Sequence, residues 1–216
     1  EYEWKTDLLW CKKILLWLIE FIFNYLYKNH KENLLYFISE KKLLEKKKNI
    51  ENWPIKIDFK DAIELLYRDT KDPIYKEFSL KHFWPREEIR LTELLWWNVL
   101  IEKFPMLQIP FYHAIADEEY NGVPLAKNVD LILYGYRETI GAGERIRSKD
   151  VLLKKAEIFN LPRQDYLPYT QSRDFEDYCT TSGFGLWWQR LVHWLTDQPT
   201  IYQSTIIPRT HLFPNP

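Results

Sequence analysis

The stretch VDLILYGYRETIGAGER (Val129–Arg145) decides the fold class of this chain. Val129–Leu133 and Arg137–Ile140 have the composition of two short strands, and Gly135 lies between them where the chain must turn. We therefore expect an antiparallel pair. Helical patterns are interleaved with such strands along the chain, and neither a Walker-type phosphate loop nor a GxGxxG motif is present. The sequence predicts an α+β domain in which helices flank an antiparallel β-sheet.

The chain on the C-terminal side of this hairpin predicts two helices and a strand. Ser148 is suited to cap a helix that runs to about Phe159. The second informative stretch, TSGFGLWWQR (Thr181–Arg190), reads as a glycine-spaced strand that passes into a final helix. The apolar side of that helix is predicted to comprise Trp187, Leu191, Trp194 and Leu195, which follow helical spacing.

The N-terminal side is predicted to be mainly helical, within one domain that spans residues 1–216. Residues 1–50 form a helical segment and residues 55–216 the sheet-and-helix core. Because apolar residues lie on most faces of the first helix, we expect it to be largely buried. The predicted elements are a helix from Trp4 to Asn29, a helix from Lys31 to Lys48, a strand over Ile55–Phe59, a helix to Tyr67 capped by Asp58 or Asp61, a helix near Arg86–Asn98, a strand within Trp97–Phe104 and a turn at Asn121-Gly122.

Composition excludes several classes of protein. The chain has 216 residues and a formal net charge of −1, so no whole-molecule attraction to nucleic acid or to an anionic membrane is expected. The apolar run Leu8–Tyr27 is interrupted by Lys12, Lys13 and Glu20, which favours a buried amphipathic helix over a membrane span. The two cysteines are far apart in sequence and are interpreted as reduced thiols in a cytoplasmic protein.

Three further features have a simple structural interpretation. The 10 tryptophans are interpreted mainly as core residues. The lysine-rich run Lys41–Lys48 is interpreted as a solvated surface, with a local contact to a phosphate backbone as the alternative. The sequence begins at Glu1 without a methionine, so we expect a truncated, processed or partial polypeptide.

Asp130 and Glu138 are the candidate metal ligands. They stand eight residues apart on the two limbs of the predicted hairpin. Carboxylates on neighbouring strands can share a hard cation such as Mg²⁺, which prefers oxygen ligands and completes its shell with water and phosphate. The alternative is a pair of ordinary surface acids.

Arg145 and Arg190 are the candidate anion-binding residues. Arg145 follows Gly141-Ala-Gly143, where the backbone leaves room for a ligand, and its guanidinium suits a carboxylate or an amide. Its alternative role is a salt bridge to Glu144 or another acid. Arg190 lies near the start of the final helix, where an anion would meet both the guanidinium and the helix dipole. Its alternative is an exposed surface arginine.

Taken in order, these segments resemble the C-terminal half of a class II aminoacyl-tRNA synthetase catalytic domain. The asparaginyl branch is the most similar. The neighbouring aspartyl branch and the related archaeal-type asparagine synthetase are similar as well. The resemblance rests on an ordered set of motifs rather than on any one of them. These motifs are Ile57–Leu66, Phe104-Pro105 followed by Phe111-Tyr112, the hairpin Val129–Arg145, the motif 3 strand Ser182–Leu186 with Arg190, and Ile207-Pro-Arg-Thr210, with Glu1-Tyr-Glu3 similar to the tail of motif 2.

The resemblance implies a ligase that uses ATP and Mg²⁺ to activate aspartate or asparagine as an aminoacyl-adenylate. By position, Asp130 and Glu138 match the acids at the metal and phosphates, and Arg145 matches the arginine that recognises the substrate side chain. The rest of the implied site comprises Gly141, Ala142 and Gly183 under the substrate, Gly185 under the nucleotide, and Arg190 at the terminal phosphate. The implied partner is a second copy or a complementing N-terminal segment. The activated amino acid is passed either to tRNA or to an amidation that forms free asparagine. No membrane partner is expected.

The chain departs from the family pattern in motif 3. Trp187 stands where the family has a glycine and Gln189 where it has an acid, and Thr181 occupies a position expected to hold a histidine. Motif 1 and the arginine-bearing body of motif 2 have no counterpart in the sequence. These departures keep a second hypothesis open, a catalytically inactive synthetase-like module for binding or assembly. A nucleic-acid-binding fragment that uses the lysine-rich run is a third, which the near-neutral charge disfavours.

Overall fold

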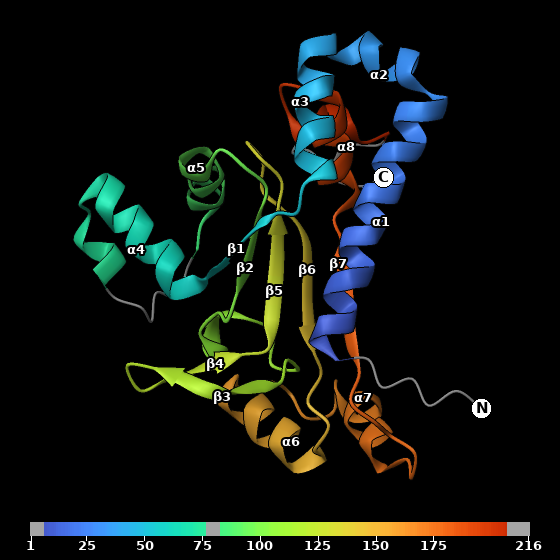
Figure 1. Cartoon of the computed structure of the whole chain (residues 1–216). Coiled ribbons are helices and arrows are strands. Elements are labelled where there is room, and N and C mark those ends of the chain that lie inside the picture. Colours follow the sequence, from blue (N-terminus) through green and yellow to red (C-terminus); the bar gives the residue numbers. More distant parts are fainter. Residues whose placement is uncertain (1–6, 77–82, 207–216) are drawn as a thin grey trace.

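A computed structural model describes residues 7–76 and 83–206 of the chain (Figure 1). The predictions that involve Glu1–Trp4 and Ile207–Thr210 therefore lie outside the described residues. The α-helices are α1 Leu8–Asn29, α2 Lys31–Phe37, α3 Glu40–Glu51, α4 Phe59–Thr70, α5 Pro85–Leu95, α6 Lys149–Ile158, α7 Leu167–Gln171 and α8 Trp188–Thr196. The strands are β1 Ile55–Asp58, β2 Val99–Glu102, β3 Ile115–Tyr120, β4 Val123–Ala126, β5 Asn128–Ile132, β6 Glu138–Glu144 and β7 Ser182–Leu186.

A five-stranded sheet with the order β1-β2-β5-β6-β7 forms the centre of the fold. The β5–β6 hairpin is antiparallel, as the sequence predicts, and β2 and β7 flank it as further antiparallel partners. At the β1 edge, however, β1 pairs with β2 in parallel, which the sequence did not predict. The α4 and α5 helices connect these two strands and allow the parallel crossover. The α+β class with helices around the sheet is confirmed.

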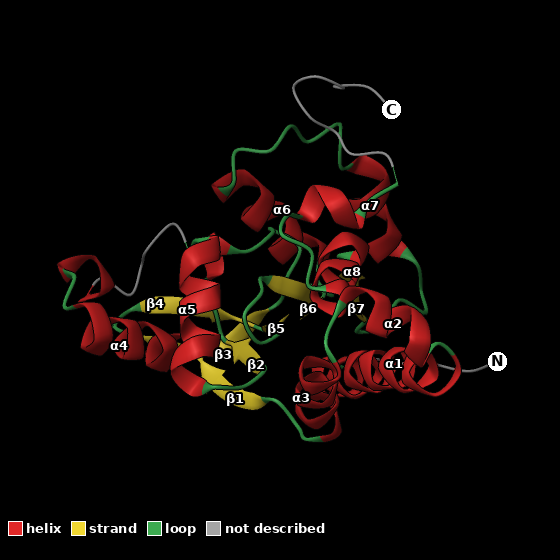
Figure 2. Ribbon diagram, turned by 90° about the horizontal axis from the view of Figure 1, so that it is seen from above, coloured by secondary structure: helices red, strands yellow, loops and turns green. Residues whose placement is uncertain are grey.

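Alternating residues of the central strands face two separate apolar cores. Val129 and Leu131 of β5 and Ile140 of β6 pack against α1 and α8 on one face. Ile132 of β5 and Ile101 of β2 face the opposite side, where α4 and α5 pack. Because side chains alternate along a strand, Asp130 is directed to this second face. Figures 1 and 2 show α1 running along the first face beside β6 and β7, with α3 next to it.

Side-chain caps explain the starts of α6 and α3; the first agrees with the prediction and the second corrects it. Ser148 caps α6 by accepting a hydrogen bond from the Val151 N–H, as predicted. The single helix expected over residues 31–48 is wrong, because the chain is extended at Ile38 and Ser39 then begins a new helix, α3, by capping the Lys42 N–H. The strands β3 and β4 were not predicted, although the turn between them at Asn121-Gly122 was.

The prediction of a largely buried first helix is also only partly correct. Cys11, Leu15, Ile19 and Phe23 are buried at four-residue spacing, but the opposite face of α1 is exposed. Trp17 is 61% exposed and stacks in line with Phe21 and Tyr25. No helix within the described residues is both long and apolar enough to span a bilayer.

The interpretation of the tryptophans as core residues is wrong for most of those that the structure describes. Trp194 is buried in the core between α8 and α1. The exposed set comprises Trp10, Trp17, Trp53, Trp84, Trp96, Trp187 and Trp188. Trp187 precedes α8 instead of contributing to its buried side, which Leu191, Trp194 and Leu195 form.

Candidate functional site

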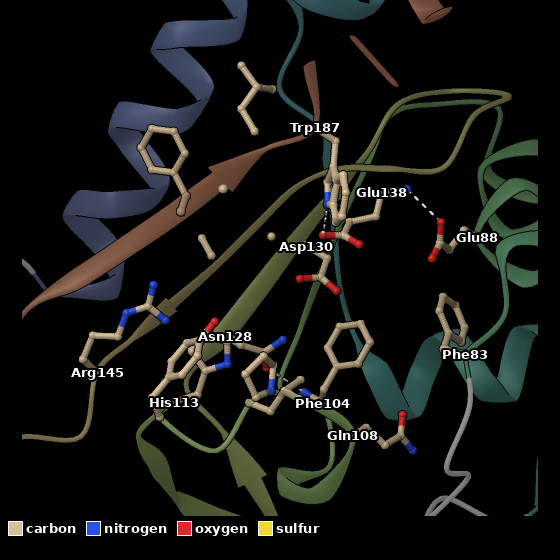
Figure 3. A pocket seen from close by; sticks show the side chains of 18 of the residues that line it. Phe83, Glu88, Phe104, Gln108, His113, Asn128, Asp130, Glu138, Arg145 and Trp187 are labelled. Atoms are coloured by element: carbon tan, nitrogen blue, oxygen red, sulfur yellow. Dashed lines mark hydrogen bonds between the residues drawn. The ribbon is translucent and has the colours of Figure 1, made fainter. Parts of the chain in front are cut away.

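A cavity of about 810 Å³ lies on the sheet face opposite α1 (Figure 3). Asp130, Glu138 and Trp187 group on one side of it, and Arg145 and His113 lie at the other end. The lining residues come from the sheet, from α5 and the residues just before it, from the segment that joins β2 to β3, and from the junction between β7 and α8. They include Phe83, Glu88, Gln108, Tyr112, His113, Asn128, Asp130, Glu138, Gly141, Arg145, Gly185 and Trp187.

Glycines of β6 and β7 leave part of the floor of this cavity without side chains. Gly141 lies opposite Gly185 in the β6–β7 register, and Gly143 lies opposite Gly183. Directly opposed residues of antiparallel strands project to the same face, so all four lie on the cavity side of the sheet, and Gly141 and Gly185 line the cavity itself. A methyl group on Gly185 would meet no atom within 4 Å, whereas one on Gly183 would lie 3.2 Å from Nη2 of Arg145. The open part of the floor is therefore over Gly185.

Ala142 contributes to the floor in a different way from the neighbouring glycines. It opposes Val129 in the β5–β6 register, and both belong to the core on the α1 side. Its methyl group therefore points away from the cavity, and its backbone forms the floor between Gly141 and Gly143.

The carboxyl groups of Asp130 and Glu138 converge over Gly141. Asp130 opposes Gly141 across the β5–β6 pair. The point at which a Gly141 methyl carbon would lie is 2.5 Å from Oε1 of Glu138 and 3.5 Å from Oδ1 of Asp130. The hairpin thus brings the two predicted metal ligands to one place, and the absence of a side chain at position 141 makes room for their oxygens.

The electrostatics of this acid pair fit a cation. The pKa of Asp130 is raised well above its usual value, first by burial and then by the like charges of Glu138 and Glu88. Burial also raises the pKa of Glu88, whose Oε2 accepts a hydrogen bond of 2.8 Å from the Glu138 N–H. A divalent cation would relieve this repulsion. Among the described residues, no three His, Cys, Asp or Glu side chains form a complete metal site, so phosphate and water would supply the other ligands of Mg²⁺.

Arg190 and Trp187 both contact Glu138. Nη1 of Arg190 donates to the Glu138 carbonyl oxygen at 2.5 Å and lies 3.4 Å from its carboxylate Oε2. The indole Nε1 of Trp187 donates to Oε1 of Glu138 at 3.3 Å, and the Arg190 guanidinium lies 4.5 Å from the indole ring centre. Arg190 is therefore not an exposed surface arginine, but it contacts Glu138 and is not among the residues that line the cavity.

Arg145 has no salt bridge within the described part of the chain. The predicted alternative, an ion pair with Glu144, is wrong, because Glu144 pairs with Lys127 at 3.1 Å. The Arg145 guanidinium instead lies 4.4 Å from the ring centre of Tyr112, and its buried Nη1 has no hydrogen-bond partner. A guanidinium held by an aromatic ring and unpaired in a cavity is suited to bind a carboxylate or an amide.

Sequence reasoning missed several polar residues of the cavity. Glu88 comes from α5, while His113 and Gln108 come from the segment between β2 and β3. Asn128 precedes the predicted hairpin strand, and its Oδ1 accepts a hydrogen bond from the Phe104 N–H at 3.1 Å. None of these residues has a characteristic spacing relative to the hairpin. A usable signal existed only for Asn128, which lies two residues before Asp130 and hence on the same face of a strand.

Comparison with known proteins identifies the family. The family model for class II tRNA synthetases (D, K and N) matches residues 5–211. This chain belongs to that family. The asparagine–tRNA ligase of Clostridium botulinum strain Hall is 28% identical over 197 residues, which cover 89% of this chain and 42% of that protein. The asparagine–tRNA ligase of Acholeplasma laidlawii is 28% identical over 201 residues, with the same two coverages.

Solved structures of this family share the fold. The asparaginyl-tRNA synthetase from Pyrococcus horikoshii complexed with asparaginyl-adenylate aligns with a TM-score of 0.84 and 25% identity, over 95% of this chain and 45% of that one. The Entamoeba histolytica asparaginyl-tRNA synthetase, at 23% identity and a TM-score of 0.78, is similar in fold. The synthetase-like chain thus spans less than half the length of the curated relatives and solved structures that it matches.

Proposed function

We propose that this chain forms the substrate-side part of an ATP-dependent ligase that activates aspartate or asparagine as an aminoacyl-adenylate. The observation that carries the proposal is the arrangement of one cavity with two ends. A converging acid pair occupies one end, an unpaired arginine the other, and a floor that includes Gly141 and Gly185 joins them. The similarity to asparagine–tRNA ligases supports an amino acid with a short polar side chain as the substrate.

Each end of the cavity has a separate part in the reaction. Arg145 binds the side chain of the amino acid and so places its α-carboxylate toward the acid pair. An oxygen of this carboxylate attacks the α-phosphorus of ATP and forms a new P–O bond. The bond between the α-phosphorus and the α–β bridging oxygen breaks, and its electron pair leaves with pyrophosphate. Asp130 and Glu138 would hold Mg²⁺, which stabilises the charge that develops on the phosphate oxygens.

Trp187 and Arg190 favour a second candidate function, a synthetase-like binding module without catalysis. In the described structure the Arg190 guanidinium contacts Glu138 rather than the cavity, and the Trp187 indole stands beside the same carboxylate. Both groups would have to move if Arg190 is to reach a phosphate. If they do not move, the cavity binds an amino acid or an adenylate without turning ATP over.

Amino-acid-dependent exchange of pyrophosphate into ATP tests the ligase proposal. We expect exchange with aspartate or asparagine, and its loss in Glu138→Gln and in Arg145→Ala. Glu119→Gln is the matched control for charge removal, since Glu119 is an exposed acid of β3 outside the cavity. Absence of exchange even when the complementing polypeptide is supplied, combined with tight binding of an adenylate analogue, would favour the binding module and overturn the ligase.

The acceptor and the partner chain are separate parts of the proposal. We propose tRNA as the acceptor and a second copy or a complementing polypeptide as the source of the remaining ATP contacts. Charging of tRNA, measured beside formation of free asparagine, distinguishes the two acceptors, and sedimentation in the presence of ATP shows whether two copies associate.

A further inference from the structure

His113 lies near Arg145 at one end of the cavity (Figure 3). A methyl carbon on Gly143 would lie 2.2 Å from Cδ2 and 2.5 Å from Nε2 of the His113 ring. The imidazole therefore fills the place that the side chain of residue 143 would take. His113 is 8% exposed, lines the cavity, and its backbone forms an isolated antiparallel bridge with Arg145.

Several contacts fix this imidazole as a wall. The Ala114 N–H donates to the Glu144 carbonyl at 2.7 Å, which ties the segment to the end of β6. The buried Lys155 of α6 donates from Nζ to the His113 carbonyl at 2.8 Å. The Tyr112 ring packs edge to face against the imidazole, with 4.9 Å between the ring centres, and the Arg145 guanidinium stacks on the same ring. The same aromatic ring thus positions both the arginine and the histidine.

The wall is polar but uncharged. Burial, followed by the positive charges of Arg145 and Lys155, lowers the pKa of His113 to about 3. A neutral imidazole does not compete with Arg145 for an anion. Its buried Nδ1 has no hydrogen-bond partner within the described structure, and neither has Nδ2 of Asn128, which opposes Gly143 in the β5–β6 register. Unsatisfied buried polar atoms of this kind are uncommon except where a ligand completes them.

We propose that His113 determines the length of the amino-acid side chain that this cavity accepts. The inference rests on the proposed function, because it names a specificity determinant of the same site. Because the His113 ring covers Gly143, the part of the floor beside Arg145 that carries no side chain ends before Gly143. A four-carbon amino acid such as aspartate or asparagine reaches the guanidinium within that space, and the extra methylene of glutamate or glutamine meets the imidazole.

Binding of four non-hydrolysable aminoacyl-adenylate analogues, with aspartyl, asparaginyl, glutamyl and glutaminyl side chains, tests this inference by calorimetry. We expect the unmodified chain to bind the better four-carbon analogue at least about 10-fold more tightly than its five-carbon homologue, which is the usual discrimination for one methylene. His113→Ala should reduce this ratio at least about fivefold by uncovering Gly143. His113→Gln, which keeps a neutral polar side chain of similar length, should retain most of the ratio.

His193→Ala is the matched control, because His193 packs against Tyr136 away from the cavity. A length preference that is unchanged in His113→Ala, or equally reduced in His193→Ala, would overturn the inference while leaving the proposed function intact. The inference also fails, without any variant, if the unmodified chain binds the five-carbon analogues as tightly as the four-carbon ones. Binding of none of the four analogues would instead overturn the proposed function, and this inference with it.

Discussion

Replacement of Gly143 by alanine is the most direct test of how the floor and the wall of the cavity fit together. The new methyl carbon would lie 2.2 Å from the nearest ring atom of His113, whereas nonbonded carbons pack at about 3.5–4 Å. The ring would have to retreat by more than about 1 Å. It has little freedom to do so, because it is buried against Tyr112 and its backbone is held by Lys155.

The expected cost follows from this overpacking. An extra methyl group in a packed interior usually costs about 1–3 kcal/mol. The lower chain entropy of alanine in the unfolded state offsets about 0.4–1 kcal/mol of that. Because the ring has little freedom to move, we expect Gly143→Ala to fall in the upper part of the remaining range, about 1–2.5 kcal/mol in the free energy of unfolding and about 2–10 °C in the melting temperature. Gly185→Ala, where the methyl group meets nothing within 4 Å, should change stability by less than about 0.5 kcal/mol or raise it slightly.

Urea unfolding of four chains measures the coupling between Gly143 and His113. The set is the unmodified chain, Gly143→Ala, His113→Ala and the double variant, with Gly185→Ala alongside. If the methyl group and the ring compete for one space, Gly143→Ala should cost less than about 0.5 kcal/mol once the ring is gone. Equal costs in both backgrounds, or equal costs at Gly143 and Gly185, would refute the placement of the imidazole over Gly143.

Three further variants test other parts of the site. Arg145→Lys removes the planar fork and its stacking on Tyr112, so calorimetry should show at least about 10-fold weaker amino-acid binding with ATP binding unchanged; equal weakening of both would contradict a role at the side-chain end. Trp187→Gly should tighten ATP binding, because it clears the indole from beside Glu138, and unchanged or weaker binding would show that the indole does not crowd the nucleotide. Lys155→Met tests the buried amine, since burial lowers the pKa of Lys155 to about 8 while the unfolded chain keeps the proton to about 10.5. The unfolded state therefore binds more protons between these pH values. The stability of the unmodified chain relative to Lys155→Met should rise with pH across that window, by about 3 kcal/mol at most. A stability difference in urea unfolding that does not change with pH would contradict the lowered pKa.

The parts of the fold that were predicted from sequence are those fixed by local chemistry. The β5–β6 hairpin follows from two short segments of strand-like composition around a glycine, and the cap at Ser148 follows from its hydroxyl group. The parallel β1–β2 pair did not follow, because parallel partners are joined by long crossovers that leave no local signal. The exposed apolar residues of α1 led to the incorrect prediction of a largely buried helix, because hydrophobicity alone does not show which face of a helix packs against the core.

For the candidate site, too, the residues with local sequence signals were predicted and those placed by long-range packing were not. Asp130, Glu138 and Arg145 were predicted because one hairpin carries all three. Strict alternation would place Glu138, three residues before Gly141, on the other face of the sheet, and the register shift after Leu131 brings it to the same side as Asp130. His113 and Glu88 could not be predicted, because their positions depend on where the β2–β3 segment and α5 pack on the sheet. The glycines were recognised as a means of close approach, but the sequence does not distinguish an open floor at Gly185 from a position at Gly143 already filled by another residue.

The contacts of Glu138 connect the two candidate functions. Its backbone N–H donates to Glu88, its carbonyl accepts from Arg190, and its carboxylate contacts both Arg190 and Trp187. A cation bound to this carboxylate would compete with Arg190 for the same oxygens, and a displaced guanidinium would then be available to a phosphate. The ligase therefore requires that ligand binding separate Arg190 from Glu138, whereas the binding module requires that this pair persist. A structure with an adenylate analogue and Mg²⁺ bound distinguishes them by the position of the guanidinium.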